Sequence, residues 1–193
     1  MLKNIFNKGT GAGGNQTNIN GLSFEIKTSI EKKLLENNFE KIIINKKNKY
    51  DYYFEYNKDN KIIYLTQSGF KTFIKKEFNV DIYKNPDEAF IIYKNDNYYI
   101  KILEKKNQNV AGSVEDKLKT GAFNKREYEI MFNNKQFIIS YAFCVSNYLK
   151  KKFESKEIKY VNMKQILLED NIKLFYGDDD NYLDVIYDWI ITI

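Results

Sequence analysis

A pair of apolar runs joined by a polar turn constrains the fold of this chain more than any other feature. The stretch NPDEAFIIYKNDNYYIKILEKK covers residues 85–106, and its Asn95-Asp96 pair is typical of a two-residue β-hairpin turn. Such a turn fixes the pairing of the two strands, and counting back along both of them sets Asp87 opposite Glu104. Facing side chains of an antiparallel pair lie about 4.5–5.5 Å apart on one face of the sheet. The hairpin is therefore expected to bring two carboxylates together.

Side chains beyond Glu104 alternate between the two faces, so Lys106 and Gln108 are expected on the face of Glu104 and Lys105 on the opposite face. Two carboxylates this close repel each other unless a cation lies between them. Their oxygens are ligands that Mg²⁺ prefers, and Mg²⁺ keeps several waters while it contacts a phosphate. The spacing therefore predicts a Mg²⁺ site that hydrolyses phosphodiesters. The alternative is that charged residues at the ends of strands simply face solvent.

Two roles are open to Lys106 in such a site. As an ammonium group it would orient the attacking water or stabilise the charge that develops on the phosphate. Desolvated beside apolar walls, it would instead lose its proton readily and act as a base. Lys105 points away from the site and is expected to contribute little to the rate.

Several absences narrow the function and the compartment. Histidine is missing from all 193 residues, which excludes His-based triads, HNH-type nucleases and His-ligated zinc sites. The single cysteine, Cys144, lies in the apolar run FIISYAFCV and is expected to be buried. One thiol forms no internal disulfide, which favours a reducing compartment. No apolar run is long enough to span a membrane. We therefore expect a cytoplasmic protein without a membrane partner.

The balance of charge permits an acidic partner such as DNA. The chain has 31 Lys and Arg residues against 26 Asp and Glu residues, which gives a formal net charge of +5. Lys, Asn, Ile and Tyr are also the residues that an AT-rich genome over-produces. Most of the lysines are therefore expected on a solvated surface, and only those in a special context are assigned a role.

Hydrophobic periodicity predicts one domain built on a mixed sheet. Residues 1–20 are rich in Gly and Asn and are expected to form an N-terminal arm, whereas residues 21–193 form the domain. Besides the hairpin, strands are expected at 41–45, 50–56, 61–66, 136–145 and 171–177. Helices are expected at 22–36, 68–78 with Ser68 as N-cap, 113–131, 146–155, 161–170 and 182–193, the last capped by the acidic run 178–180. This order is typical of an α/β or α+β domain in which helices flank a central mixed β-sheet.

One short motif resembles the signature of a nuclease superfamily. Pro86-Asp87, followed after sixteen residues by Glu104-Lys105-Lys106, is similar to the PD-(D/E)XK motif of restriction-endonuclease-like nucleases. Further segments extend the likeness to a group of type II restriction endonucleases over most of residues 9–129: GTGAGGNQTNINGLSFE, TQSGFKTFIKKEF, PDEAF, EKKNQNVAGSVEDKL and KREYE. The resemblance implies a restriction-endonuclease-like fold and Mg²⁺-dependent cleavage of double-stranded DNA that leaves 5′-phosphates.

The resemblance also implies roles for individual residues. Asp87 and Glu104 would bind the metal, Lys106 would assist the attacking water, and Glu25, in LSFE, would join the metal site. Gln108 would assist the metal site or contact the cleaved strand, unless it lies exposed. A palindromic recognition site would require a homodimer. A DNA methyltransferase encoded nearby would favour restriction over repair.

The glycine-rich segment at residues 9–14 is either a flexible arm or a segment whose amides approach DNA phosphates. In the second case four polar residues would lie near a groove: Asn15, Gln16, Thr17 and Asn18. Lys117 either decorates its helix or faces the DNA.

Two other functions stay open from the sequence. One is another nuclease of the same fold, acting in repair, in junction resolution or for a phage. The other is a nucleic-acid-binding module that does not cleave. The complete set of two acids and a lysine counts against the second, because a descendant that only binds is expected to have lost one member of the set.

Overall fold

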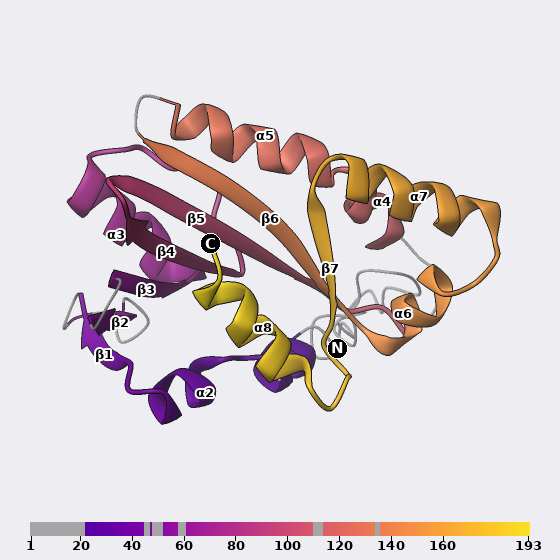
Figure 1. Cartoon of the computed structure of the whole chain (residues 1–193), viewed down its shortest axis with the longest axis horizontal. Coiled ribbons are helices and arrows are strands. Elements are labelled where there is room, and N and C mark those ends of the chain that lie inside the picture. The colour runs from indigo at the N-terminus through magenta and orange to yellow at the C-terminus, as the bar shows by residue number, and fades with distance from the viewer. Residues whose placement is uncertain (1–21, 45–46, 48–51, 58–60, 110–113, 134–135) are drawn as a thin grey trace, which may run out of the picture.

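A seven-stranded mixed sheet with the strand order β1-β2-β3-β4-β5-β6-β7 lies at the centre of the computed structural model (Figure 1). Its strands are β1 Glu40–Ile43, β2 Tyr52–Asn57, β3 Lys61–Thr66, β4 Glu88–Lys94, β5 Asn97–Lys106, β6 Phe137–Val145 and β7 Ile172–Tyr176. Strands β1 to β5 pair antiparallel with their neighbours, whereas β6 runs parallel to β5 and β7 runs parallel to β6. The structure describes all residues except 1–21, 45–46, 48–51, 58–60, 110–113 and 134–135, so the expected arm lies outside the described residues.

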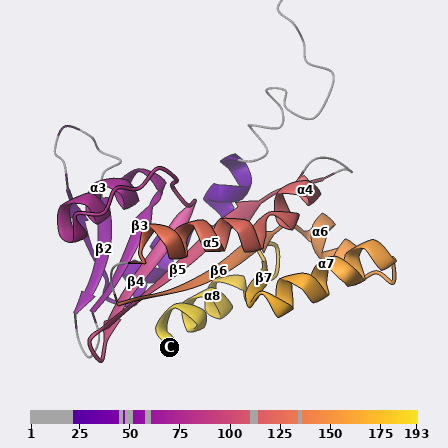
Figure 2. The ribbon, with the colours of Figure 1, turned by 90° about the horizontal axis from the view of Figure 1, so that it is seen from above.

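Helices cover both faces of the sheet, and each face buries its own apolar core. One face carries α3 Gln67–Phe78, α4 Val114–Lys119, α5 Gly121–Met131, α6 Asn147–Phe153 and α7 Ile158–Glu169; the other carries a short helix at 22–27, α2 Glu31–Glu36 and α8 Tyr182–Ile191. Figure 2 looks onto the first layer, where α5 packs on β6. Consecutive residues of a strand enter opposite cores, as Ile102 and Leu103 of β5 do. The prediction of a single mixed domain, with helices flanking a central sheet, is confirmed.

The prediction that the single cysteine is buried is confirmed. Cys144 is fully buried in β6, within the core on the side of α8. Burial raises the pKa of its thiol to about 12. Among the helices that the structure describes, none has the length and apolar character needed to cross a membrane.

The change from antiparallel to parallel pairing gathers three strand ends at one edge of the sheet. Helices α4 and α5 connect β5 to β6, and α6 and α7 connect β6 to β7, so these three strands run the same way. Their last residues, Lys106, Val145 and Tyr176, lie side by side. The start of β4 lies at the same edge, because β4 is antiparallel to β5. Ligands of open α/β sheets bind at such carboxyl ends, and the residues of the predicted site lie here.

The β4–β5 hairpin has the predicted register. Pairing runs without interruption from the turn to Glu88, which faces Leu103. Asn95 and Asp96 have φ values of 50° and 60°, the left-handed values that a type I′ turn requires. Asn and Asp tolerate this conformation better than other residues with a side chain. The turn therefore fixes which residues of the two strands face each other.

The expected helix at 22–36 is wrong in one respect, because the chain forms two short helices there. Helix 22–27 ends where the Thr28 hydroxyl donates a hydrogen bond of 2.7 Å to the Phe24 carbonyl, and α2 begins at Glu31. A threonine that bonds to the carbonyl four residues back weakens a helix at that point. The expected apolar stripe is divided accordingly: Leu22, Ile26 and Leu35 are exposed, whereas Phe24, Ile30 and Leu34 are buried.

Two other helix predictions need correction. The expected helix at 113–131 is divided into α4 and α5 at Thr120, whose hydroxyl and amide both donate to the Lys117 carbonyl. These bonds close the last turn of α4 and turn the chain toward β6. Ser68 is not the N-cap of α3, because the helix already begins at Gln67 and Thr66 holds the N-cap position.

The acidic run 178–180 caps a different helix from the one expected. Asn181 precedes α8 without a side-chain capping bond. Asp178 instead accepts a hydrogen bond of 2.6 Å from the Asn147 amide at the start of α6, and its other oxygen lies 2.6 Å from the Lys27 ammonium. A carboxylate stabilises the first turn of a helix wherever the fold brings it there. Because β6 and β7 end at the same edge, the acid after β7 reaches the helix after β6.

The close packing of α3 on β2 yields a test of the fold. A methyl group at Gly69 would overlap the backbone carbonyl of Tyr52. Replacing a glycine within a helix by alanine normally stabilises a protein by about 0.5–1 kcal/mol, but here we expect Gly69→Ala to destabilise it by about 1–3 kcal/mol through overpacking. Urea unfolding measures the difference. Lys71→Ala, on the exposed side of the same helix, is the control and should stay within about 0.5 kcal/mol of the wild type; a stabilising Gly69→Ala would contradict the packing.

Candidate active site

Two carboxylates and one ammonium group meet at the carboxyl edge of the sheet. Asp87 directly precedes β4, and Glu104 and Lys106 lie on one face at the end of β5. The Lys106 Nζ atom lies 2.7 Å from Glu104 Oε2 and 3.5 Å from Asp87 Oδ2. The structure therefore brings together the three residues that the hairpin register predicted to converge, and the lysine supplies the cation between the two acids.

The backbone of β5 holds Asp87 in this position. The Lys105 amide donates a hydrogen bond of 2.7 Å to Asp87 Oδ2, the same oxygen that faces Lys106. This bond continues the pairing of the hairpin by one residue beyond Glu88, with a side chain taking the place of a backbone carbonyl. The position of the Asp87 carboxylate is therefore set by the strand and not by Lys106 alone.

Charge and burial oppose each other in this cluster. Burial raises the pKa of the Glu104 carboxyl group and the charge of Asp87 adds to this effect, while Lys106 and Lys84 act in the opposite direction. Burial by itself would lower the pKa of the Lys106 ammonium, but the charges of Glu104 and Asp87 outweigh it and raise the pKa. Lys106 therefore holds its proton in this arrangement, which favours the role of a fixed cation over that of a base.

Glu25 reaches the site from the opposite layer. It lies on helix 22–27, and together with Asp87 it lines a cavity of about 240 Å³ at the edge of the sheet. Burial raises the pKa of the Glu25 carboxyl group, and the charge of Asp87 raises it further. Within the described part of the chain, however, no three acidic, histidine or cysteine side chains form a cluster that would hold a metal ion. Glu25 is a neighbour of Asp87 at this cavity, and its expected part in a metal site stays a prediction.

The backbone of Gln108, just after the end of β5, is held by two hydrogen bonds. The residue is buried, which rules out the alternative that it lies exposed. The Gln108 amide donates to the Ser146 hydroxyl at 3.2 Å, and that hydroxyl donates to the Gln108 carbonyl at 2.7 Å. This pair of bonds ties the chain after β5 to the N-cap of α6, next to the candidate site.

The structure says little about the residues that are expected to contact DNA. Lys117 is exposed on α4, as both of its expected roles require. The remaining candidates lie outside the described residues: Asn15, Gln16, Thr17 and Asn18.

A second cation near the carboxylates was missed by the sequence analysis. Lys84 donates to Asn124 Oδ1 at 2.5 Å and to Glu127 Oε2 at 2.8 Å, both on α5. Its charge lowers the pKa of Glu104, so its ammonium group lies within electrostatic reach of the cluster. Only its position, three residues before Asp87 in the same loop, hinted at this role. Lys84 links the loop that carries Asp87 to α5.

Two buried tyrosines close the other side of the cluster. Burial raises the pKa of Tyr128 and of Tyr141, and the nearby charge of Glu104 raises both further. Both hydroxyls therefore stay protonated. Tyr141 accepts a hydrogen bond of 3.3 Å from Asn124. These buried rings form an apolar wall on the α5 side of the sheet, the side of Glu104, and nothing in the local sequence indicated this position.

A second ion pair lies on the opposite face of the same strand ends. Lys105 Nζ lies 2.7 Å from Glu88 Oε1, and the two side chains are only 3% and 5% exposed. The Tyr64 hydroxyl donates to the same glutamate oxygen at 3.0 Å. Lys105 thus points away from Lys106, as predicted, but it is a buried residue with a fixed partner.

The mutual repulsion of the two carboxylates can be measured without metal or DNA. Because the charge of Asp87 raises the pKa of Glu104, we expect Asp87→Asn to lower the pKa of Glu104. The asparagine oxygen can still accept the hydrogen bond from the Lys105 amide. The Glu104 carboxyl carbon would be titrated by NMR in metal-free buffer. Asp81→Asn, which removes a surface carboxylate 2.8 Å from Lys75, is the control that should leave Glu104 unchanged. An unchanged or raised pKa in Asp87→Asn would show that the two acids are not neighbours.

Comparison with known proteins gives no match: no family model, no curated protein and no solved structure matches this chain. The likeness of residues 86–106 to PD-(D/E)XK nucleases therefore stays an expectation from the sequence. The candidate site rests on the contacts among Asp87, Glu104 and Lys106.

Proposed function

We propose that the protein is a Mg²⁺-dependent endonuclease that hydrolyses double-stranded DNA, most similar to a type II restriction enzyme. The observation that carries the proposal is the contact of one protonated lysine with two carboxylates at the carboxyl edge of the sheet. The motif spacing and the strand–turn–strand context of the PD-(D/E)XK signature add support. Restriction of foreign DNA would take place in the cytoplasm, which suits a chain whose only cysteine is buried and reduced.

The donor set fits a hard divalent ion. Asp87 and Glu104 present carboxylate oxygens to one point, and an ammonium group already lies between them. Mg²⁺ needs only one or two protein carboxylates, because it retains several waters. These two residues would hold the ion, with Glu25 close behind Asp87. When bound, Mg²⁺ would supply a Lewis acid that lowers the pKa of a bound water and neutralises charge on the phosphate.

The other contributions to the reaction would come from side chains of the protein. Lys106, as an ammonium group, would orient the attacking water and stabilise the phosphate oxygen on which charge develops, and the proton of that water would pass to solvent. The wall formed by Tyr128 and Tyr141 lowers the local dielectric, so these interactions are stronger than in water. Attack at phosphorus with cleavage of the bond to O3′ leaves a 5′-phosphate and a 3′-hydroxyl. A homodimer would act on both strands of a palindromic site, and a DNA methyltransferase encoded nearby would protect the host.

Digestion of plasmid DNA tests this proposal directly. The purified protein would be incubated with defined plasmids and Mg²⁺, and the ends of the fragments sequenced. Discrete fragments with a common end sequence and 5′-phosphates are expected. A smear of unrelated ends would assign the fold to another nuclease role, such as repair or junction resolution. Binding of DNA without any cleavage would assign it to a module that only binds.

Lys106 should be essential for the rate of cleavage. We expect Lys106→Ala to slow single-turnover cleavage by roughly a hundredfold or more, the usual cost of losing a positioned electrostatic group. Metal binding should persist, because both carboxylates remain. Lys75→Ala is the control, since Lys75 also pairs with an acid but lies on the surface at α3, away from the site. If Lys106→Ala cuts at the wild-type rate, Lys106 has no part in the reaction.

The choice of metal should separate binding from cleavage. Ca²⁺ accepts looser geometry than Mg²⁺ and activates water poorly. We therefore expect Ca²⁺ to support DNA binding with little cleavage, and Mg²⁺ to support both. Gel-shift and cleavage assays on the same DNA measure the two effects. Cleavage that continues in excess chelator would contradict a metal-dependent mechanism.

A further inference from the structure

One residue, Lys105, contacts the segments that carry Asp87, Glu88 and Glu25. Its backbone amide holds the Asp87 carboxylate at 2.7 Å. Its ammonium group lies 2.7 Å from Glu88 at the start of β4 and donates to the backbone carbonyl of Glu25 at 3.3 Å. Lys105 therefore joins β5, β4 and helix 22–27 at the point where Asp87 and Glu25 approach each other.

The ion pair between Lys105 and Glu88 is not explained by stability alone. Both side chains are almost completely buried, and removing two charges from water costs about as much as their attraction returns. Replacing such a pair by apolar residues of similar volume is often neutral or stabilising. A buried lysine at this position therefore points to a geometric role, which an apolar residue could not fill because it has no donor for the Glu25 carbonyl.

Helix 22–27 depends on such contacts for its position. Six residues are too few to form a stable helix by themselves. Its C-terminal end is held by the ion pair of Lys27 with Asp178 and by close packing at Gly177, where a Cβ atom would lie 2.6 Å from Thr28 and 2.7 Å from the Phe24 ring. Lys105 adds the contact with the backbone carbonyl of Glu25 itself, which neither of these contacts involves.

We propose that Lys105 is a positioning residue: it fixes helix 22–27 to the start of β4 and thereby places the Glu25 carboxylate beside Asp87. Its importance for cleavage rests on the proposed function, whereas its hold on the helix does not. Loss of Lys105 leaves Asp87, Glu104 and Lys106 in place but lets Glu25 move away. The site then needs more Mg²⁺ to reach the same occupancy. The expectation that Lys105 contributes little is therefore revised.

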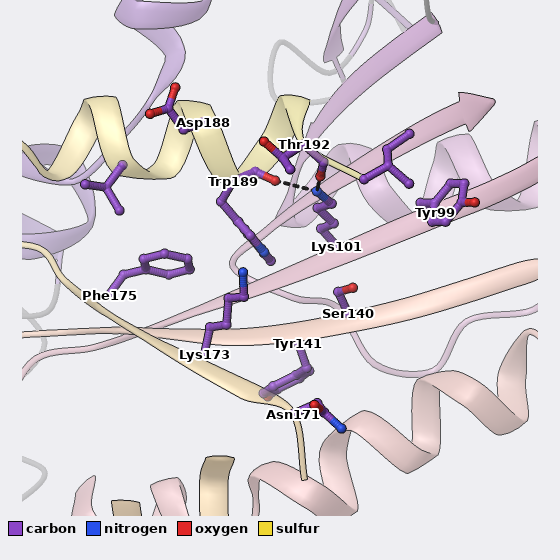
Figure 3. Close-up of a pocket in the computed structure, with 12 residues that line it drawn as sticks. Tyr99, Lys101, Ser140, Tyr141, Asn171, Lys173, Phe175, Asp188, Trp189 and Thr192 are labelled. Carbon is purple, nitrogen blue, oxygen red and sulfur yellow. Dashed lines mark hydrogen bonds between the residues drawn. The ribbon is translucent and has the colours of Figure 1, made fainter. Parts of the chain in front are cut away.

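The strand offers a closely matched control. Lys101 lies on β5 on the same face as Lys105, is only 4% exposed, and also donates to backbone carbonyls. Those carbonyls belong to Trp189, Ile190 and Thr192 at the end of α8, and Figure 3 shows Lys101 pointing to that end. Lys101 therefore matches Lys105 in strand, face and burial, but its bonds go to backbone carbonyls where Lys105 also pairs with a carboxylate, and it holds a different helix.

The test compares two variants by two independent readouts. The double variant Glu88→Gln/Lys105→Met removes both charges together, so no buried charge is left without a partner; Lys101→Met is the control. Hydrogen–deuterium exchange reports the protection of each helix. The Mg²⁺ concentration that gives half-maximal single-turnover cleavage reports the metal site. Glu25→Gln, at an exposed position, shows what loss of the carboxylate alone does to the second readout.

We expect the double variant to exchange at least tenfold faster in residues 22–27 and to need roughly tenfold more Mg²⁺. Glu25→Gln should show a similar Mg²⁺ shift without faster exchange, and Lys101→Met should show faster exchange only at the end of α8. If the double variant does not fold, Glu88→Gln alone takes its place, because glutamine has nearly the same shape as glutamate. This variant should show a smaller increase of exchange in residues 22–27. The proposal would be overturned if the double variant, or Glu88→Gln in its place, showed wild-type exchange in residues 22–27, or showed faster exchange there with an unchanged Mg²⁺ requirement. Absence of cleavage by the wild type would refute only the nuclease function, because exchange still decides whether Lys105 holds the helix.

Discussion

The arrangement at the edge of the sheet depends on the two-residue turn at Asn95-Asp96. Both residues take left-handed backbone values, and the turn joins β4 to β5 without a bulge. Side chains alternate along a strand, so a shift of the pairing by one residue would exchange the two faces. Glu104 and Lys106 would then both lie on the face of Glu88, and both would be separated from Asp87. A turn at one end of the hairpin thus decides the chemistry at the other end.

The end of β5 carries lysines that balance acidic side chains on both faces of the sheet. Lys106 balances Glu104 and Asp87 on the side of α5, while Lys105 balances Glu88 on the side of helix 22–27. The first cluster is partly open and the second is closed. An open cluster with more acid than base can accept a further cation, whereas a closed and balanced pair can only hold structure. The two clusters contain the same types of residue, so the difference between them follows from their burial.

The sequence predicts a contact best when it follows from a short, regular stretch of the chain. The hairpin register and the meeting of Asp87 with Lys106 follow from one short turn, so they could be predicted. The break at Thr28 depends on a single local hydrogen bond, which the apolar periodicity does not reveal. The capping of α6 by Asp178 joins residues that are 31 positions apart. Lys84 and the wall of Tyr128 likewise reach the site only through the packing of α5 on the sheet. Such contacts leave no periodic pattern, because each arises once.

The burial of Cys144 has a practical consequence. Its thiol lies in the core with a pKa raised to about 12, so in the native state it is neither accessible nor ionised at neutral pH. Alkylating reagents therefore have no competing target in the folded protein. A cysteine introduced at an exposed position of helix 22–27, such as Ile26, would carry a fluorophore or a spin label by itself. Movement of this helix can thus be followed without replacing Cys144, so the natural core stays intact.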